Sequence, residues 1–360
     1  MNGFGSNRRQ FMAGLLAAGV APLPTWADAG SPTYLSAAAK SDGTYVLCGI
    51  NDDLSVGFEI PLPDRGHAAT AHPTRPEAVA FARRPGTFAV VIDCVTGAQK
   101  AMLAAPDGRH FYGHGAYSSD GALLFTTEND YEVGTGRIGV WDATRGYKRV
   151  DDWDSGGIGP HDIKRLPGTD VLVIANGGID THPDSGRTKL NIPTMAPKLA
   201  YIENGAVLEE AALPAALHKN SIRHLAVSRD GMVALGMQWQ GETQPDSLVG
   251  MHRRGEDIIL MQAPMDAVRV MEGYIGSVAI SADGDLIATT SPRGGQMQIY
   301  DVKSQTLKEA LQLEDVCGVA QRGAGFTLTA GTGALQSFAD SEQAIARTAP
   351  LAWDNHLIRI

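Results

Sequence analysis

The sequence repeats one pattern of short strands and turns at intervals of roughly 40 to 50 residues. One copy runs from an apolar segment into Ser118-Ser119-Asp120-Gly121, then through a second apolar segment and a glycine-bearing loop to Trp141-Asp142. Another runs in the same order through Ser281-Ala282-Asp283-Gly284 to Tyr300-Asp301. Asp and Gly suit such turns because both adopt left-handed backbone conformations and Asp bonds its own backbone. A period of this length is typical of β-propeller blades.

Weaker copies of the pattern cover the rest of the chain. The units begin near Tyr34, Gly66, Tyr112, Gly159, Ser221, Gly273 and Asp315. Their strands are short and punctuated by glycine, with no sustained helical periodicity. The sequence therefore predicts an all-β fold, a seven-bladed β-propeller of the WD40/YVTN-like kind, because radial closure protects strand edges. The tail from His356 to Ile360 is expected to complete the last blade, after a loop or one helical turn over residues 341–350.

The first 29 residues have the organisation of an export signal. Asn7-Arg8-Arg9-Gln10-Phe11-Met12 precedes an apolar run over residues 13–23 and a stretch of small residues that ends at Ala29. The paired arginines resemble the twin-arginine (Tat) consensus, and the apolar run is too short for a membrane anchor. We predict a Tat signal peptide over residues 1–29, cleaved after Ala27 or Ala29, and a single propeller domain over residues 30–360. The mature protein is expected in the periplasm, exported folded and without a membrane span.

Composition narrows the class of protein further. With 43% hydrophobic residues the chain has enough apolar side chains for a core. Its net charge is −10 and its mature region has no basic run, so we expect no nucleic-acid partner. The three cysteines are Cys48, Cys94 and Cys317, and none belongs to a CxxCH motif that would attach haem. We expect all three to be small buried residues.

Histidines recur at one position of the repeat. His114 and His224 lie four residues before the turn serines Ser118 and Ser228. At the same distance from the degenerate turns of their own units lie His67 and His161. This position is the start of the first, innermost strand, so the four imidazoles are predicted to ring one mouth of the central channel. Imidazole is a common ligand of Fe, Cu, Zn and Ni.

Two other interpretations of the histidines remain open. WD-type repeats use a Gly-His pair to hold each blade together, but that His normally lies further upstream of the turn than His114 does. A ring of hydrogen-bonded or solvated histidines without a metal is the second interpretation. His356, near the end of the chain, and Cys317, one position off register, are candidate further members of the ring.

The loops that follow the second strands are polar and are expected to open on the same mouth. The fourth unit also carries an insertion over residues 179–197, and loops of this length are usually functional or flexible. The candidate mouth residues are Glu128, Asn176, Asp180, His182, Asp184, Arg187, Arg223, Trp239 and Arg293. For an enzyme, Glu128, Asp180 and His182 would be the acid–base groups, and Arg223 or Arg293 would stabilise an anion.

Several motifs together resemble the DUF1513 family of bacterial Tat-exported proteins. They are the twin-arginine start, Gly113-His114-Gly115, Gly159-Pro160-His161-Asp162, the segment from Asn176 to Asn191, and Trp353-Asp354-Asn355-His356. The resemblance covers nearly the whole mature chain and implies a YVTN/WD40-like propeller without a settled activity. Members are often encoded beside imelysin-like and di-haem oxidoreductase-like proteins, which implies such partners and a role in periplasmic iron acquisition.

Three functions are therefore considered for the chain. The first is binding of a transition metal (iron or copper) or a metal chelate by His67, His114, His161, His224 and His356. The second is a metal-dependent oxidoreductase or a lactonase-like enzyme, although no G-x-S-x-G nucleophile motif is present. The third is a protein-interaction platform without catalysis. Fold alone does not decide among them.

Overall fold

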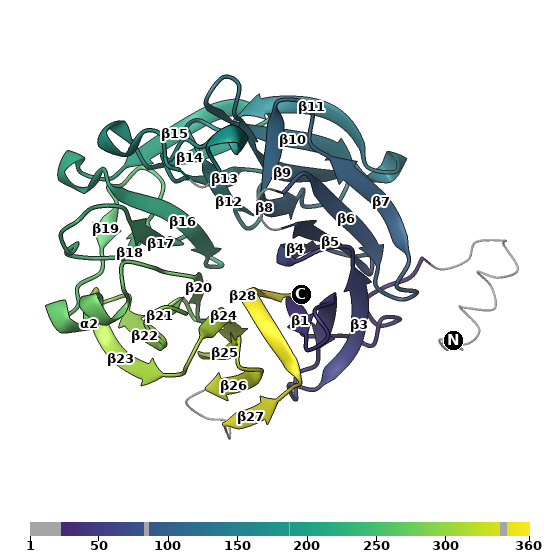
Figure 1. Ribbon diagram of the computed structural model, residues 1–360. Coiled ribbons are helices and arrows are strands. Elements are labelled where there is room, and N and C mark those ends of the chain that lie inside the picture. The colour runs from purple at the N-terminus through teal and green to yellow at the C-terminus, as the bar shows by residue number, and fades with distance from the viewer. Residues whose placement is uncertain (1–22, 83–85, 187, 339–343) are drawn as a thin grey trace, which may run out of the picture.

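The strands form seven four-stranded antiparallel sheets arranged as a closed wheel (Figure 1). The computed structural model describes residues 23–82, 86–186, 188–338 and 344–360. The innermost strands of neighbouring sheets contact one another around a common axis. The predicted all-β, seven-bladed β-propeller is therefore confirmed.

Six blades follow one another along the chain, each from its innermost strand outward. Blade 2 is β4 (Gly66–Ala71), β5 (Glu77–Ala82), β6 (Phe88–Asp93) and β7 (Gln99–Ala104). Blade 3 is β8 (Arg109–Tyr117), β9 (Leu123–Asp130), β10 (Thr135–Asp142) and β11 (Lys148–Asp154). Blade 4 is β12 (Pro160–Arg165), β13 (Leu172–Asn176), β14 (Lys198–Glu203) and β15 (Ala206–Ala212).

Blades 5 to 7 repeat this order. Blade 5 is β16 (Asn220–Val227), β17 (Val233–Trp239), β18 (Val249–His252) and β19 (Ile259–Leu260). Blade 6 is β20 (Ser277–Ile280), β21 (Leu286–Ser291), β22 (Gln296–Asp301) and β23 (Thr306–Gln312). Blade 7 is β24 (Val316–Arg322), β25 (Gly325–Ala330), β26 (Ala334–Phe338) and β27 (Ile345–Thr348). Short helices lie between strands: η1 (Ala143–Arg145), η2 (Pro183–Ser185), η3 (Ile192–Thr194), η4 (Ala215–Leu217) and α2 (Met265–Val270).

Blade 1 joins the two ends of the chain. Its three outer strands are β1 (Tyr34–Lys40), β2 (Tyr45–Ile50) and β3 (Val56–Leu62), and its innermost strand is the C-terminal β28 (Leu351–Arg359), drawn in yellow beside β1 (Figure 1). Two expectations were wrong. The tail completes the first blade rather than the last, so the first unit begins with a second strand, and residues 345–348 form an outer strand of blade 7 rather than a loop or helical turn.

The hydrophobic core is divided into clusters that lie between blades. The described residues form seven clusters, and each joins the apolar side chains of two neighbouring blades. In the cluster between blades 7 and 1, Trp353 and Leu357 of β28 pack with Ala320 and Leu335. Because apolar burial is the main favourable term in folding, every blade is stabilised chiefly by its two neighbours. All three cysteines are free and buried, as expected.

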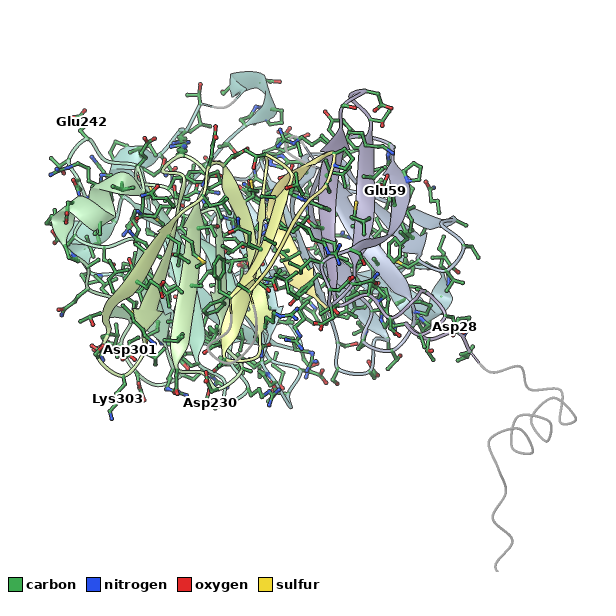
Figure 2. All side chains as sticks on the ribbon, turned by 90° about the horizontal axis from the view of Figure 1, so that it is seen from below. Asp28, Glu59, Asp230, Glu242, Asp301 and Lys303 are labelled. Atoms are coloured by element: carbon green, nitrogen blue, oxygen red, sulfur yellow. The ribbon has the colours of Figure 1, made fainter. Side chains whose placement is uncertain are left out.

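The repeated turns gather at one end of the wheel. In the turn after β8, Ser118 Oγ donates to Asp120 Oδ1 at 2.7 Å and accepts from the Leu123 backbone N–H at 2.9 Å. Figure 2 shows Asp230, from an equivalent turn, at this end and Glu242, from the loop after β17, at the opposite end. We call these ends the turn face and the loop face. The loops after the second strands therefore open on the loop face.

Most of the predicted signal peptide lies outside the described residues, which begin at Leu23. A turn over residues 26–30 contains both predicted cleavage positions, Ala27 and Ala29. In this turn the Trp26 indole N–H donates to the His72 carbonyl oxygen at 3.0 Å. Among the described helices, none has the length and apolar character needed to cross a membrane.

Candidate metal centre

β-Bulges in the innermost strands place the histidines. A bulge interrupts the pairing of β28, β4, β8, β12, β16 and β24 with the next strand, whereas β20 pairs regularly. The bulges contain His67 in β4, His114 in β8, His161 in β12 and His356 in β28, and His224 directly follows the bulge in β16. A bulge re-aims side chains locally, so an inner strand can direct an imidazole at the axis without changing the face of its other residues.

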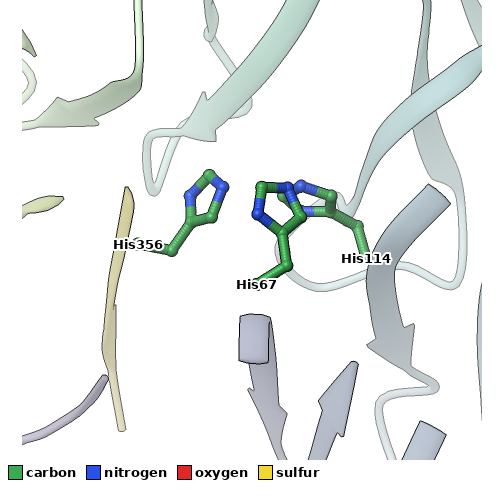
Figure 3. A group of neighbouring side chains, drawn as sticks. All are labelled: His67, His114 and His356. Carbon is green, nitrogen blue, oxygen red and sulfur yellow. The ribbon is translucent and has the colours of Figure 1, made fainter. Parts of the chain in front are cut away.

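The five imidazoles converge on the axis of the wheel. His114 lies 5.0 Å from His67, 4.7 Å from His356 and 5.0 Å from His161, measured between ring centroids. His224 lies 4.8 Å from His161 and 5.0 Å from His356, which completes the circuit. Figure 3 shows His67, His114 and His356 pointing toward one another from separate strands. The predicted convergence of the four in-register histidines is confirmed, and His356 joins them as the fifth member.

Two triads within this cluster could hold a metal ion. One is His67, His114 and His356, and the other is His114, His161 and His224. In each triad the candidate ligand nitrogens lie within 4.8 Å of one another. His114 belongs to both, so it is the central member of the cluster.

Hydrogen bonds to groups behind the rings orient two of the imidazoles. His114 Nδ1 lies 3.1 Å from Asp162 Oδ1, and His161 Nδ1 lies 3.0 Å from the backbone oxygen of Arg223. Both partners accept hydrogen bonds, so Nδ1 carries the proton and Nε2 carries the lone pair. A carboxylate or carbonyl behind a histidine is the usual arrangement around protein-bound metals, because it fixes the tautomer and the ring orientation.

Several ring nitrogens in the cluster are buried without a hydrogen bond. Among the described residues, His114 Nε2, His356 Nε2 and both nitrogens of His224 have no hydrogen-bond partner. An unsatisfied buried polar atom destabilises a fold by about 1–3 kcal/mol. A metal ion among the imidazoles would use these lone pairs.

Asp162 is the charged residue beneath the cluster. Its carboxylate accepts from the Leu225 N–H at 2.9 Å and from Lys164 Nζ at 3.0 Å, besides His114. Burial alone would raise the pKa of this carboxyl, but the Lys164 charge and His114 hold it far below its usual range. Asp162 is therefore a buried anion that links its own strand β12 to the inner strands β8 and β16.

The imidazoles are held in the neutral form that binds metals. Burial, reinforced by the neighbouring His114, lowers the pKa of His224 to about 3. Burial also lowers the pKa of His161, with a contribution from Arg223, and the pKa of His356, with a contribution from His114, well below the ordinary value. Near neutral pH these three rings are free of the proton that would compete with a metal ion.

Acid is expected to destabilise the metal-free protein through these rings. Below the ordinary histidine pKa of 6.5 the unfolded chain takes up protons that the folded His224, with a pKa of about 3, does not. The stability that the neutral His224 contributes is therefore fully present above pH 6.5 and is lost as the pH is lowered. The loss from His224 alone is about 2 kcal/mol at about pH 5. Urea unfolding across this range measures the loss. In His224→Gln the fall should be shallower, and an equally steep fall would contradict this origin.

The cluster lies inside the channel rather than at its opening, which corrects the predicted position. On the loop face, a cavity of about 270 Å³ is lined by His67, Tyr112, His161, Lys189, Arg223, His224, Gln238, Tyr274, Arg293 and Asn355. Toward the turn face, a second cavity of about 410 Å³ reaches His224, His356 and Asp162. Ligands would therefore reach the imidazoles through one of these two cavities.

Some predicted mouth residues lie elsewhere in the fold. Glu128 is completely buried in β9, where it binds Arg149 at 2.6 Å and Arg109 at 3.6 Å, so it is not a free acid–base group at the mouth. The predicted mouth position of Glu128 is wrong because β9 continues through the expected loop. Asn176, at the end of β13, is hydrogen bonded to Ser155 and joins blades 4 and 3. Neither side chain lines the loop-face cavity.

The insertion after β13 does not gather its polar residues into a site. His182 begins η2, packs its ring edge-to-face with Tyr131 at 5.1 Å, and accepts from the Asp184 N–H at 3.2 Å. The Asp184 side chain is 91% exposed. Asp180 is bonded through its backbone to Asn191 and lies outside the loop-face cavity. Arg187 lies outside the described residues.

Two of the remaining candidate residues line the loop-face cavity, and two lie elsewhere. Arg223 and Arg293 both line the loop-face cavity. Trp239 instead packs against the hydrophobic cluster between blades 5 and 6. The Cys317 thiol donates to the Asp315 carbonyl oxygen at 3.1 Å and is in neither histidine triad.

Several residues of the site were not among those predicted from the sequence. Asp162 directly follows His161, and this adjacency was the available signal for it. Lys189, Gln238, Tyr274 and Asn355 line the loop-face cavity from four different segments, so no local pattern could have grouped them.

Comparison with known proteins supports the fold and the family but gives no activity. A family model described as "Protein of unknown function (DUF1513)" matches residues 60–360. No curated protein matches the chain significantly. A solved structure titled "Kuenenia stuttgartiensis Hydrazine Synthase" is similar with a TM-score of 0.60 and 13% identity, covering 86% of this chain and 90% of that one. Identity this low shows a common fold alone.

Proposed function

Because this chain belongs to the DUF1513 family, whose function is unknown, we propose a function from its own channel: binding of a transition-metal ion, or its chelate, by the histidine cluster. The observation that carries this proposal is the pair of triads that have His114 in common. The charge and hydrogen bonds around the triads support it. Asp162 orients His114, and burial keeps His161, His224 and His356 neutral.

Iron and copper are the metals that we propose. The site offers imidazole nitrogens, which suit Fe, Cu, Zn and Ni, and none of the thiolates that soft metal sites use. Asp162 supplies a negative charge behind the imidazoles, which favours a cation. Three histidines of one triad would leave coordination positions for a further ligand from the loop-face cavity.

Metal analysis of the whole protein tests the proposal. Protein stripped with EDTA would be dialysed against Fe²⁺, Cu²⁺ or Zn²⁺, desalted and analysed for bound metal. We expect one tightly bound ion per chain, and for Cu²⁺ an electron paramagnetic resonance spectrum split by nitrogen ligands. If none of these ions stays bound in stoichiometric amount, the histidines are a hydrogen-bonded structural cluster and the proposal is wrong.

We further propose that the protein acts in periplasmic iron acquisition, after export by the Tat pathway, with imelysin-like and di-haem oxidoreductase-like proteins as partners. The support is the twin-arginine motif and the implied gene neighbourhood of the family. Growth of a deletion strain under iron limitation is the corresponding test. Normal growth and normal cellular iron would contradict this role without affecting the metal site itself.

A further inference from the structure

The loop-face cavity above the histidine cluster carries positive charge. Three cationic side chains line it, Lys189, Arg223 and Arg293, together with two tyrosines and two side-chain amides. No Asp or Glu is among its described lining residues. The whole chain has a net charge of −10, so this concentration of cations runs against the overall charge. A cavity with this lining favours an anion.

Arg223 connects the cavity to the histidine cluster. It lies in the bulge of β16, beside His224, and is only 8% exposed. Its backbone oxygen accepts from His161 Nδ1 at 3.0 Å, while its side chain lines the cavity. One residue therefore orients a candidate ligand and presents a guanidinium group just above it.

Arg293 provides a second guanidinium group at the rim. It is exposed, in the loop after β21, and its guanidinium carbon lies 4.3 Å from the centre of the Tyr274 ring. The Tyr274 hydroxyl in turn accepts from Asn355 Nδ2 at 3.4 Å, next to His356. Stacking on an aromatic ring leaves the planar N–H groups of an arginine available for an oxyanion.

The three cations come from three neighbouring blades, so they are attached to separate parts of the cavity wall. Lys189 belongs to the insertion in blade 4, Arg223 to blade 5 and Arg293 to blade 6. Separated cations fit an anion whose charges are themselves separated, rather than one compact ion. The volume of about 270 Å³ corresponds to about nine water molecules at roughly 30 Å³ each, the size of a small organic acid.

We propose that this cavity binds a small di- or tricarboxylate. Its carboxylates accept hydrogen bonds from Arg223 and Arg293, and one carboxylate faces the imidazoles. The anion site itself does not require a metal. Only the role of that carboxylate as the remaining ligand of a bound ion rests on the proposed function.

Calorimetric titration of EDTA-stripped, full-length protein with citrate tests the inference. We expect binding that is weakened by salt and at least about tenfold weaker in Arg293→Gln, since a hydrogen bond to a charged group contributes about 1.5–3 kcal/mol. Arg293 is exposed, so this variant should fold normally, and Arg223→Gln should lose more affinity. Lys303→Gln removes the same charge from the turn face and should bind citrate like the unaltered protein (Figure 2).

Several outcomes of this titration would overturn the inference. Absence of citrate binding to both metal-free and copper-loaded protein would do so, as would equal affinity in Arg293→Gln. Phosphate binding as tightly as citrate would replace a polycarboxylate with a compact anion. Copper loading of the same proteins separates the two proposals, because Arg293→Gln should retain copper. Citrate that removes the copper, rather than altering its spectrum while it stays bound, would exclude the ligand role.

Discussion

Replacing His114 with glutamine is expected to abolish stoichiometric metal binding. His114 belongs to both triads, so its loss leaves each with two imidazoles. Glutamine retains a side-chain N–H donor for Asp162, which limits the disturbance of the buried carboxylate beneath the ring. We expect the affinity for copper to fall by at least about a hundredfold, measured by competition with a chelator of known affinity.

Two further variants test whether the loss of copper binding is specific to His114. His218→Ala removes a partly buried histidine outside the cluster, whose ring is hydrogen bonded to the Ala215 carbonyl oxygen, and it should bind copper like the unaltered protein. Asp162→Asn leaves all five imidazoles in place but weakens the orientation of His114, so an intermediate loss of about 10- to 100-fold is expected. Unchanged copper affinity in His114→Gln would place the metal elsewhere.

Removing the C-terminal strand is expected to prevent folding. A chain ending at Pro350 lacks β28, which pairs with β1 and packs against β4 and β24. It also loses Trp353 and Leu357 from the cluster that joins blades 7 and 1. The inner edge of β1 would be exposed, and unpaired edges promote aggregation.

The truncated protein should be insoluble, or should show no cooperative thermal transition by circular dichroism. Arg359→Ala is the matched control at the end of the same strand. It removes a largely exposed side chain and one hydrogen bond to the Gln321 carbonyl oxygen, so the melting temperature should change little. A truncated chain that melts cooperatively near the temperature of the full-length protein would show that the wheel closes without β28.

The fold and the centre of the site could be predicted from the sequence because both depend on the repeated blade pattern. The Ser-x-Asp-Gly turns are local, since the Ser118 side chain bonds residues only two and five positions away. The histidine register follows from the same turns, because equal positions in successive inner strands approach one axis. The family resemblance agreed with this prediction but supplied no chemistry of its own.

Sequence could not predict features that depend on contacts between distant segments. Glu128 looked like a loop residue, and only the fold brings Arg109 and Arg149 to it from β8 and β11. The exchange of β28 into blade 1 depends on pairing between the two ends of the chain, which no turn motif records. The burial of the histidines depends on the loops and the insertion above them, whose residues come from several blades.

The closing strand also has a consequence for the order of events during synthesis. β28 is synthesised after all the other described strands, and it carries both the final inner strand and His356. Until β28 is made, the chain has neither a closed wheel nor the third histidine of the first triad, so an ion could be held by that triad only afterwards. An ion held by His67, His114 and His356 would fasten the last segment of the polypeptide to β4 and β8, and occupancy would then resist the reopening of the ring.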